Sequence, residues 1–292
     1  MNTPLRVALI TGGNRGIGFA TAQHLAAQGV MVILGARDQQ RGTASAERIR
    51  MTTPGANVSV MHLDLASLAS IRAFADRYRA SGFPLHILIN NAAVVGLGKE
   101  MLFTADGFEI QFGTSHLGHF LLTNLLLPII TASAPARVIT VSSIRHFPRR
   151  FPKGGPDFDY DNLMGQKYYN NMTFYDNVKL ANIWFAYELQ RRLAGTGITS
   201  VAVCPGFVPE TIAMSRQGLA RWFYRDALQL IPGARPATTS GAEIAQLATD
   251  PQLAGVGGKF YHNGAELRSS AESYDLARAQ QLWAFSAQIT GL

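Results

Sequence analysis

The feature that most constrains this chain is a regular alternation of short apolar runs with longer segments of helical pattern. The runs are hydrophobic throughout, as expected of parallel strands that helices cover on both faces. They are Val7–Thr11, Met31–Gly35, Val58–His62, Ile87–Asn90, Arg137–Ser142, Ile198–Cys204 and Lys259–His262. The helical segments are Ile17–Gln28, Gln39–Met51, Leu68–Ser81, Gly107–Ile130, Tyr175–Leu193 and Ala237–Leu247. Right-handed crossovers then predict an α/β fold, a doubly wound parallel sheet of about seven strands with helices on both faces.

The composition excludes several classes of protein and partner. Of the 292 residues, 47% are hydrophobic and 15% are charged, which excludes a disordered or fibrous chain. The net charge of +7 comes from scattered basic residues whose longest run is Arg149–Arg150, so no nucleic acid partner is expected. The single cysteine, Cys204, forms no intrachain disulfide, and we therefore expect a reducing, cytoplasmic location.

The sequence predicts neither a secretion signal nor a transmembrane segment. Residues Met1–Arg6 lead directly into an apolar strand and leave no room for a signal peptide. The longest apolar stretch, Phe120–Ile130, is well short of the ~20 residues that cross a membrane, so we expect a buried helix.

We expect one domain, residues 1–292, with two irregular insertions. Residues 145–174 are rich in Pro, Gly, Asn and aromatic residues, and residues 207–236 mix apolar and basic groups around Trp222–Tyr224. Long irregular segments inside a compact domain are more often functional loops than linkers. Both insertions are therefore predicted to shape the substrate site, and the second is interpreted as an amphipathic lid.

A glycine-rich loop, Thr11–Gly18, lies between the first predicted strand and the first predicted helix. Gly12 permits a tight turn, Gly16 lets the backbone approach a pyrophosphate, and Gly18 allows close packing of helix on strand. The helix N-terminus adds free N–H groups and a positive dipole. This context predicts a single-domain Rossmann-type fold, with a phosphate cradle made by Gly12, Asn14, Arg15, Gly16, Ile17 and Gly18.

The residues after the second strand indicate which dinucleotide binds. An acidic side chain there would accept from the ribose hydroxyls of NAD, but the sequence offers Arg37 followed by Asp38. Arg37 together with Arg15 suits a 2′-phosphate, so NADP(H) is preferred over NAD(H). The alternative is that both arginines are solvated and Asp38 is the acidic partner.

Four motifs, taken in order, resemble the short-chain dehydrogenase/reductase family. They are Thr-Gly-x-x-x-Gly-x-Gly at 11–18, Asn-Asn-Ala-Ala at 90–93, Ser142-Ser143, and Tyr175-x-x-x-Lys179. Finer segments look like the retinol dehydrogenase and protochlorophyllide reductase-like branch, namely His116–Thr123, Lys179–Asn182, and Leu282-Trp283 with Ser286.

The resemblance implies further coenzyme contacts and leaves a homo-oligomer open. It implies that Asp64 contacts the adenine and that Pro205-Gly206 meets the nicotinamide. The predicted coenzyme residues outside the cradle are Arg37, Asp64, Leu65, Asn90, Asn91, Ala92, Tyr175, Lys179, Pro205, Gly206 and Val208. Family members often pair through the two long helices, which are expected here over 107–130 and 175–193.

Tyr175 and Lys179 form the predicted proton-transfer pair. Four residues apart on a helix, they lie on one face, and a nearby ammonium favours the phenolate and lowers the tyrosine pKa toward neutrality. The family pattern places the active hydroxyl at Ser143 rather than Ser142, where it would polarise a substrate carbonyl. The catalytic set is completed by Ser115.

Two departures from the family pattern leave a second hypothesis open. Ser115 stands where the family has an active-site Asn, and Glu210 stands in the Pro-Gly loop where Thr or Ser is usual, with Thr211 next to it. Ser has a shorter reach and a single donor, so the proton relay would be slower or rerouted. His116 and His119 are interpreted as buried or capping histidines, and no metal site is predicted.

The sequence therefore predicts an NADP(H)-dependent oxidoreductase that interconverts a carbonyl and an alcohol on a fairly apolar small molecule. Tyr175 is the general acid/base, and Lys179 assists it and holds the nicotinamide ribose. The alternative is a family relative with lost or altered redox chemistry, such as a cyclase, a dehydratase or a cofactor-binding scaffold.

Overall fold

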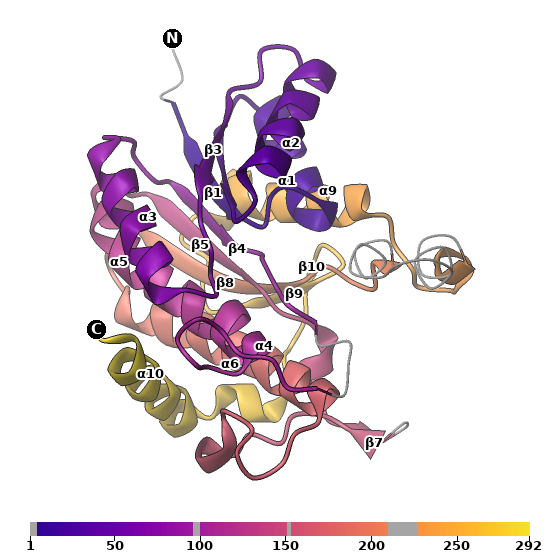
Figure 1. Ribbon diagram of the computed structural model, residues 1–292. Helices are drawn as coiled ribbons and strands as arrows, with labels where there is room; N and C mark the ends of the chain where they lie inside the picture. Colours follow the sequence, from indigo (N-terminus) through magenta and orange to yellow (C-terminus); the bar gives the residue numbers. More distant parts are fainter. Residues whose placement is uncertain (1–4, 96–99, 151–152, 210–226) are drawn as a thin grey trace.

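An eight-stranded sheet forms the centre of the computed structural model, which describes residues 5–95, 100–150, 153–209 and 227–292 (Figure 1). The strand order is β10-β9-β8-β5-β4-β1-β2-β3. All neighbouring pairs are parallel except β9 and β10. The strands are β1 (Val7–Thr11), β2 (Met31–Ala36), β3 (Val58–His62), β4 (Ile87–Asn90), β5 (Ala136–Val141), β8 (Ile198–Cys204), β9 (Phe260–His262) and β10 (Ala265–Glu266). The Rossmann-type doubly wound fold is confirmed.

Helices cover both faces of this sheet (Figure 1). One layer contains α1 (Gly16–Ala27), α2 (Gln39–Thr52) and α9 (Ala237–Thr249), and the other contains α3 (Leu68–Ala80), α5 (Gly118–Ala132) and α6 (Asn171–Arg192). Helix α10 (Leu276–Thr290) packs on the outer side of α6. The short helix α4 (Ile110–Phe112) and a π-helical turn, η1 (Gly113–Leu117), precede α5 without a break.

The two helical layers explain why the central strands are apolar at nearly every position. In β1, Ala8 and Ile10 belong to the core under the α1 and α9 layer, whereas Val7 and Leu9 belong to the core under α3, α5 and α6. Successive strand residues point to opposite faces, and here both faces are dry, so all five residues of β1 are buried.

The sheet has one strand more than the sequence analysis predicted. Strand β10 has only two residues, both exposed, and pairs antiparallel with β9, so it carries no hydrophobic pattern. The turn between them is Asn263-Gly264, with φ of 52° and 76°. Asn-Gly with two positive φ values is the typical two-residue hairpin turn, and it was the available signal for this strand.

One helix begins earlier than the sequence analysis predicted, and another was not predicted. Helix α6 begins at Asn171, four residues before Tyr175, because the Asn170 side chain accepts from the N–H groups of Met172 and Thr173. Helix α10 was not predicted as a helix, although Asp275 caps its start and Gly291 ends it in the left-handed conformation.

The first insertion, residues 145–174, contains a small hairpin and two helical turns. These are β6 (Arg149–Arg150), β7 (Lys153–Gly154), the end of η2 (Ile144–His146) and η3 (Tyr160–Asn162). Of the second insertion, the structure describes residues 207–209 and 227–236. Glu210, Thr211 and the predicted lid around Trp222–Tyr224 lie outside the described residues.

Within the described part of the chain, one helical stretch, Ile110–Ala132, is long and apolar enough to span a membrane by length and composition. Most of its apolar window is buried in the fold, between α3, α6 and the sheet. It is the core helix that the sequence analysis expected over Phe120–Ile130.

Candidate functional site

The glycine loop has the geometry of a phosphate cradle. Gly12 and Gly16 have φ of 65° and 54°, in the left-handed region that glycine adopts without strain. A Cβ on Gly18 would lie 2.5 Å from both the Gly12 carbonyl oxygen and the Asn91 side-chain nitrogen. Helix α1 starts at Gly16 and receives no side-chain cap hydrogen bond from Arg15. The first N–H groups of α1 are thus arranged to receive an anion, and the loop fits a dinucleotide pyrophosphate.

A polar junction joins the glycine loop to the segment after β4. The Thr11 hydroxyl accepts from the backbone N–H groups of Asn91 at 2.9 Å and Ala92 at 3.0 Å. The Asn91 amide donates in turn to the Thr11 carbonyl at 2.8 Å. Asn90 is buried, and its amide donates to the Thr123 hydroxyl at 3.0 Å. These bonds fix the end of β4 beside the end of β1.

Three arginines gather near the end of β2. The Arg15 pKa is lowered by burial and by repulsion from Arg41 and Arg37, so the three guanidinium groups are close in space. Asp38 caps α2 by accepting from the N–H of Arg41 at 3.0 Å and forms an ion pair with the Arg41 Nε at 3.0 Å. Asp38 is therefore already engaged, and the net charge of this corner is positive. Arg41 is a contributor that the sequence analysis missed.

The remaining predicted coenzyme residues follow the carboxyl ends of other strands. Asp64 accepts from the Ala66 N–H at 3.0 Å in the turn after β3, and Leu65 is buried against α5 at Gly118. Gly206 follows β8 with φ of 83°, and the Ser240 hydroxyl donates to the Pro205 carbonyl at 2.6 Å. Val208 is 4% exposed and belongs to the core beneath α9.

Ser143, Tyr175 and Lys179 come together at the carboxyl end of β5. Tyr175 and Lys179 lie one turn apart on α6, with the Lys179 Nζ 5.3 Å from the centre of the Tyr175 ring. Lys179 is 2% exposed and donates to the Val141 carbonyl at 3.3 Å. The Ser142 hydroxyl donates to the Lys179 carbonyl at 2.6 Å, so it is occupied in holding the helix to the strand. The hydroxyl of the neighbouring Ser143 is the one that interacts with Tyr175.

The pKa of Tyr175 differs from the value that the sequence analysis expected. Burial raises the pKa of Tyr175 to about 12, although a hydrogen bond from Ser143 and the charge of Arg145 act in the opposite direction. Burial also lowers the pKa of Lys179 to about 8. The Tyr175 pKa therefore does not approach neutrality in the coenzyme-free protein, because desolvation of the phenol outweighs the opposing effects of Ser143 and Arg145.

Ser115 lies in the π-helical turn η1, where its hydroxyl accepts from the Val94 N–H at 3.0 Å. His119, one turn later, contacts the Ser115 carbonyl through Nδ1 at 3.1 Å and the Thr11 hydroxyl through Nε2 at 2.8 Å. A carbonyl only accepts, so Nδ1 carries the proton and Thr11 donates to Nε2. Burial lowers the pKa of His119 to about 4, which agrees with a neutral ring.

His119 thus connects the glycine loop to the turn that carries Ser115. The sequence analysis interpreted this residue as a buried or capping histidine, and it is 2% exposed. Its role as a bridge was not predicted, since Thr11 and Ser115 are far from each other in sequence.

His116 and Cys204 lie in apolar surroundings. His116 stacks on Phe112 with ring centres 5.1 Å apart, contacts the Ser286 hydroxyl at 3.1 Å, and has its pKa lowered by burial to about 3. Burial raises the pKa of the Cys204 thiol, which makes it a poor nucleophile. The described residues contain no group of three or more His, Cys, Asp or Glu side chains that would hold a metal ion.

The fold and this site together define a class of protein. A glycine loop before a helix, an Asn-Asn-Ala segment beside it, and a half-buried Tyr with a buried Lys next to a serine are brought to one edge of a parallel sheet. This combination is typical of Rossmann-type dinucleotide-dependent enzymes.

Comparisons with known proteins place the chain within that class. The family described as short chain dehydrogenase matches residues 6–151. Mouse retinol dehydrogenase 12 is 39% identical over 290 residues, covering 99% of this chain and 87% of the relative. Human polyprenol dehydrogenase is 36% identical over 297 residues, covering 99% and 86%. A Pseudomonas aeruginosa RhlG/NADP active-site complex superimposes with a TM-score of 0.68 at 24% identity, covering 88% of this chain and 94% of that one.

The chain belongs to the short-chain dehydrogenase family, in the branch that contains the retinol dehydrogenases. It is an NAD(P)-dependent oxidoreductase, as the sequence analysis predicted.

Proposed function

We propose that this protein interconverts an alcohol and a carbonyl on an apolar small molecule, with NADP(H) as the preferred coenzyme. The observation that carries the proposal is the grouping of Ser143, Tyr175 and Lys179 at the strand ends that also hold the glycine loop. Tyr175 is half-buried, and its ring lies 5.3 Å from the Lys179 ammonium.

Tyr175 is the proposed general acid/base. In carbonyl reduction its phenol donates a proton to the substrate oxygen, while the Ser143 hydroxyl donates a hydrogen bond to the same oxygen. In alcohol oxidation the proton passes from the substrate hydroxyl to Tyr175, which must first have lost its own proton. The bound coenzyme supplies or accepts the hydride and, when oxidised, brings a positively charged ring. Lys179 favours the phenolate when it is protonated, which requires a pH below its pKa of about 8.

The preference for NADP(H) is supported by charge. Arg41 and Arg37 both repel Arg15, and a 2′-phosphate would relieve that repulsion. Asp38, the acidic side chain that follows Arg37, is engaged as a helix cap and ion-pair partner. A ribose hydroxyl would have to share this carboxylate with Arg41, so a bare ribose fits less well.

The apolar character of the substrate is supported by exposed apolar side chains that lie close to the site residues in sequence. Ile144 follows Ser143, Met172 precedes Tyr175 by one helical turn, and Phe207 follows Gly206; they are 46%, 39% and 37% exposed. Exposed apolar side chains beside polar reacting groups are typical of sites for apolar ligands. The names of the relatives, retinol and polyprenol dehydrogenase, agree with a lipid-like alcohol or aldehyde.

The proposal is tested by NADPH and NADH binding, followed by NADPH consumption with all-trans-retinal and a short polyprenal. We expect tighter binding of NADPH and its oxidation by at least one aldehyde. Tyr175→Phe should bind NADPH as the wild type does and lose about 10²–10⁴-fold in turnover. Tyr274→Phe, which removes the hydroxyl of an exposed tyrosine outside both insertions, is the matched control. Retained turnover in Tyr175→Phe would refute the assignment.

A second candidate, a relative with altered redox chemistry, is favoured by one observation. The Ser115 hydroxyl already accepts from the Val94 N–H, so it is partly occupied at the position where the proton relay is expected. Tight NADPH binding without consumption across a broad panel of aldehydes and ketones would support this candidate.

A further inference from the structure

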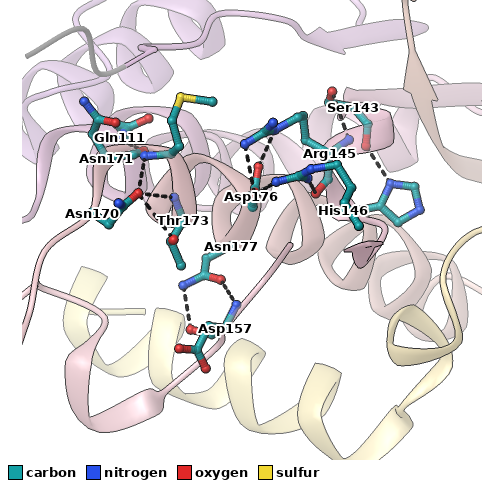
Figure 2. A network of polar contacts seen from close by, with 12 residues as sticks. Gln111, Ser143, Arg145, His146, Asp157, Asn170, Asn171, Thr173, Asp176 and Asn177 are labelled. Carbon is teal, nitrogen blue, oxygen red and sulfur yellow. Dashed lines mark hydrogen bonds and ion pairs between the residues drawn. The ribbon is translucent and has the colours of Figure 1, made fainter. Parts of the chain in front are cut away.

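A buried carboxylate directly follows Tyr175 and is held by two arginines (Figure 2). The side chain of Asp176 is 1% exposed. Its carboxylate accepts from the Arg145 Nε at 2.6 Å and Nη2 at 3.1 Å, and from the Arg149 Nη2 at 2.7 Å. The Arg145 bond is bidentate, the geometry that fixes a guanidinium most firmly.

This cluster joins the two segments that carry the proposed catalytic hydroxyls. Arg145 is two residues after Ser143, and its backbone N–H donates to the Ser143 hydroxyl oxygen at 3.3 Å. Asp176 is adjacent to Tyr175 on α6. Through the bidentate bond, the turn after β5 is tied to α6 next to Tyr175, between residues 31 positions apart in sequence.

The turn after β5 that carries Ser143, the Ser143 turn, is also held from the other side. The His146 Nδ1 donates to the Ser143 carbonyl at 2.5 Å, and its Nε2 accepts from the Ser270 N–H at 3.1 Å. Burial lowers the pKa of His146 to about 4, so the ring is neutral at physiological pH and keeps this hydrogen-bond pattern. The backbone of Ser143 therefore has little freedom to move relative to α6.

The cluster also carries an excess of positive charge. Two guanidinium groups face one carboxylate, which leaves a net charge of about +1. The groups that act on Tyr175 are the Cys204 thiol from β8, Ser143 and Arg145 from the turn after β5, and Asp176 from α6. The Lys179 ammonium, also from α6, lies 5.3 Å from the ring centre. Arg145 favours the phenolate, and Asp176 and Cys204 oppose it.

We propose that Arg145, bound by Asp176, is a positioning residue for this site: it holds the Ser143 turn against Tyr175 and places a fixed positive charge beside the phenol. Ser143 and Tyr175 then act on the same substrate oxygen without rearrangement. The kinetic part of this inference rests on the function proposed above, whereas its electrostatic part concerns the protein alone.

The electrostatic part is tested without substrate, by nuclear magnetic resonance of protein labelled at tyrosine Cζ, with Tyr175→Phe used to assign the resonance. Arg145→Gln should raise the Tyr175 pKa by about half a pH unit or more. Asp176 keeps an ion-pair partner in this variant, because Arg149 still contacts it. Arg145→Lys, which keeps the charge, should leave the Tyr175 pKa nearly unchanged. Arg150→Gln, which removes an exposed arginine of the neighbouring hairpin, is the control.

The positioning part is tested by kinetics. Arg145→Lys should lower kcat about tenfold or more with an unshifted pH profile, because charge is kept and the bidentate bond is lost. Arg145→Gln should lower kcat and also move the alkaline rise of alcohol oxidation to higher pH, with NADPH affinity unchanged in both. An Arg145→Gln protein whose Tyr175 pKa and kcat match the wild type would overturn the inference. Absence of turnover in the wild type would instead refute the proposed function, and the resonance titration would still decide the electrostatic part.

Discussion

Replacing Lys179 by Met is expected to stabilise the coenzyme-free protein at pH 7. Lys179 is 2% exposed, and burial lowers its pKa from 10.5 to about 8. At about 1.4 kcal/mol per pH unit, keeping this ammonium charged in the folded state costs about 3 kcal/mol. Met has a similar length and no charge, so the variant avoids that cost.

The variant also loses a hydrogen bond, which reduces the gain. Lys179 donates to the Val141 carbonyl at 3.3 Å, and a bond of this kind contributes about 1 kcal/mol. The carbonyl keeps a partner, because the Asn182 amide donates to it at 3.2 Å. The net expectation is a free energy of unfolding about 2 kcal/mol higher than that of the wild type.

The stability difference between Lys179→Met and the wild type should depend on pH. The folded-state pKa lies below the unfolded one, so between pH 8 and pH 10.5 the unfolded chain binds more protons and wild-type stability rises with pH. The advantage of Lys179→Met should therefore be full below pH 8 and disappear by about pH 10.5.

Urea unfolding without coenzyme at pH 7 and pH 10, followed by circular dichroism, measures both effects. Lys167→Met is the control, because Lys167 is exposed between Asp159 and Asp161 and should gain nothing. A Lys179→Met protein no more stable than the wild type at pH 7, or equally stabilised at both pH values, would refute the reasoning.

Three further outcomes are expected. Ser143→Ala should lose about 10²–10³-fold in kcat with unchanged NADPH affinity. Ser142→Ala should lose mainly about 1 kcal/mol of stability, because it removes the hydroxyl that donates to the Lys179 carbonyl. Equal losses of kcat in the two variants would contradict these different roles. Gly18→Ala should cost about 1–3 kcal/mol in urea unfolding and weaken NADPH binding, because its Cβ would lie 2.5 Å from the Asn91 amide nitrogen; unchanged NADPH affinity would count against the cradle. The free energy of unfolding should fall by up to about 4 kcal/mol per pH unit as pH drops from 6 toward 4.5, because the unfolded chain protonates three histidines that burial keeps neutral in the folded state. These histidines are His116, His119 and His146. A urea midpoint that stays constant over this interval would exclude that cause.

The parts of the fold and site that the sequence predicted are those encoded locally. Central strands such as β1 and β2 bury both faces, so nearly every residue is apolar and the run is visible in isolation. The glycine loop depends on φ values that only glycine adopts readily, and Tyr175 and Lys179 meet because a helix brings residues four apart onto one face. Strand β10 has two exposed residues, and its only local signal was the Asn263-Gly264 turn.

Contacts between distant segments, and the electrostatics they create, were decided by the tertiary structure alone. No sequence spacing relates His119 to Thr11, or Arg145 to Asp176, because each pair meets only when helices pack against strand ends. The same packing removes water from Tyr175 and Lys179, which moves their pKa values in the direction opposite to that of a solvated ion pair. Local pattern thus predicted which groups the candidate site contains, and burial decided the protonation states in which they are held.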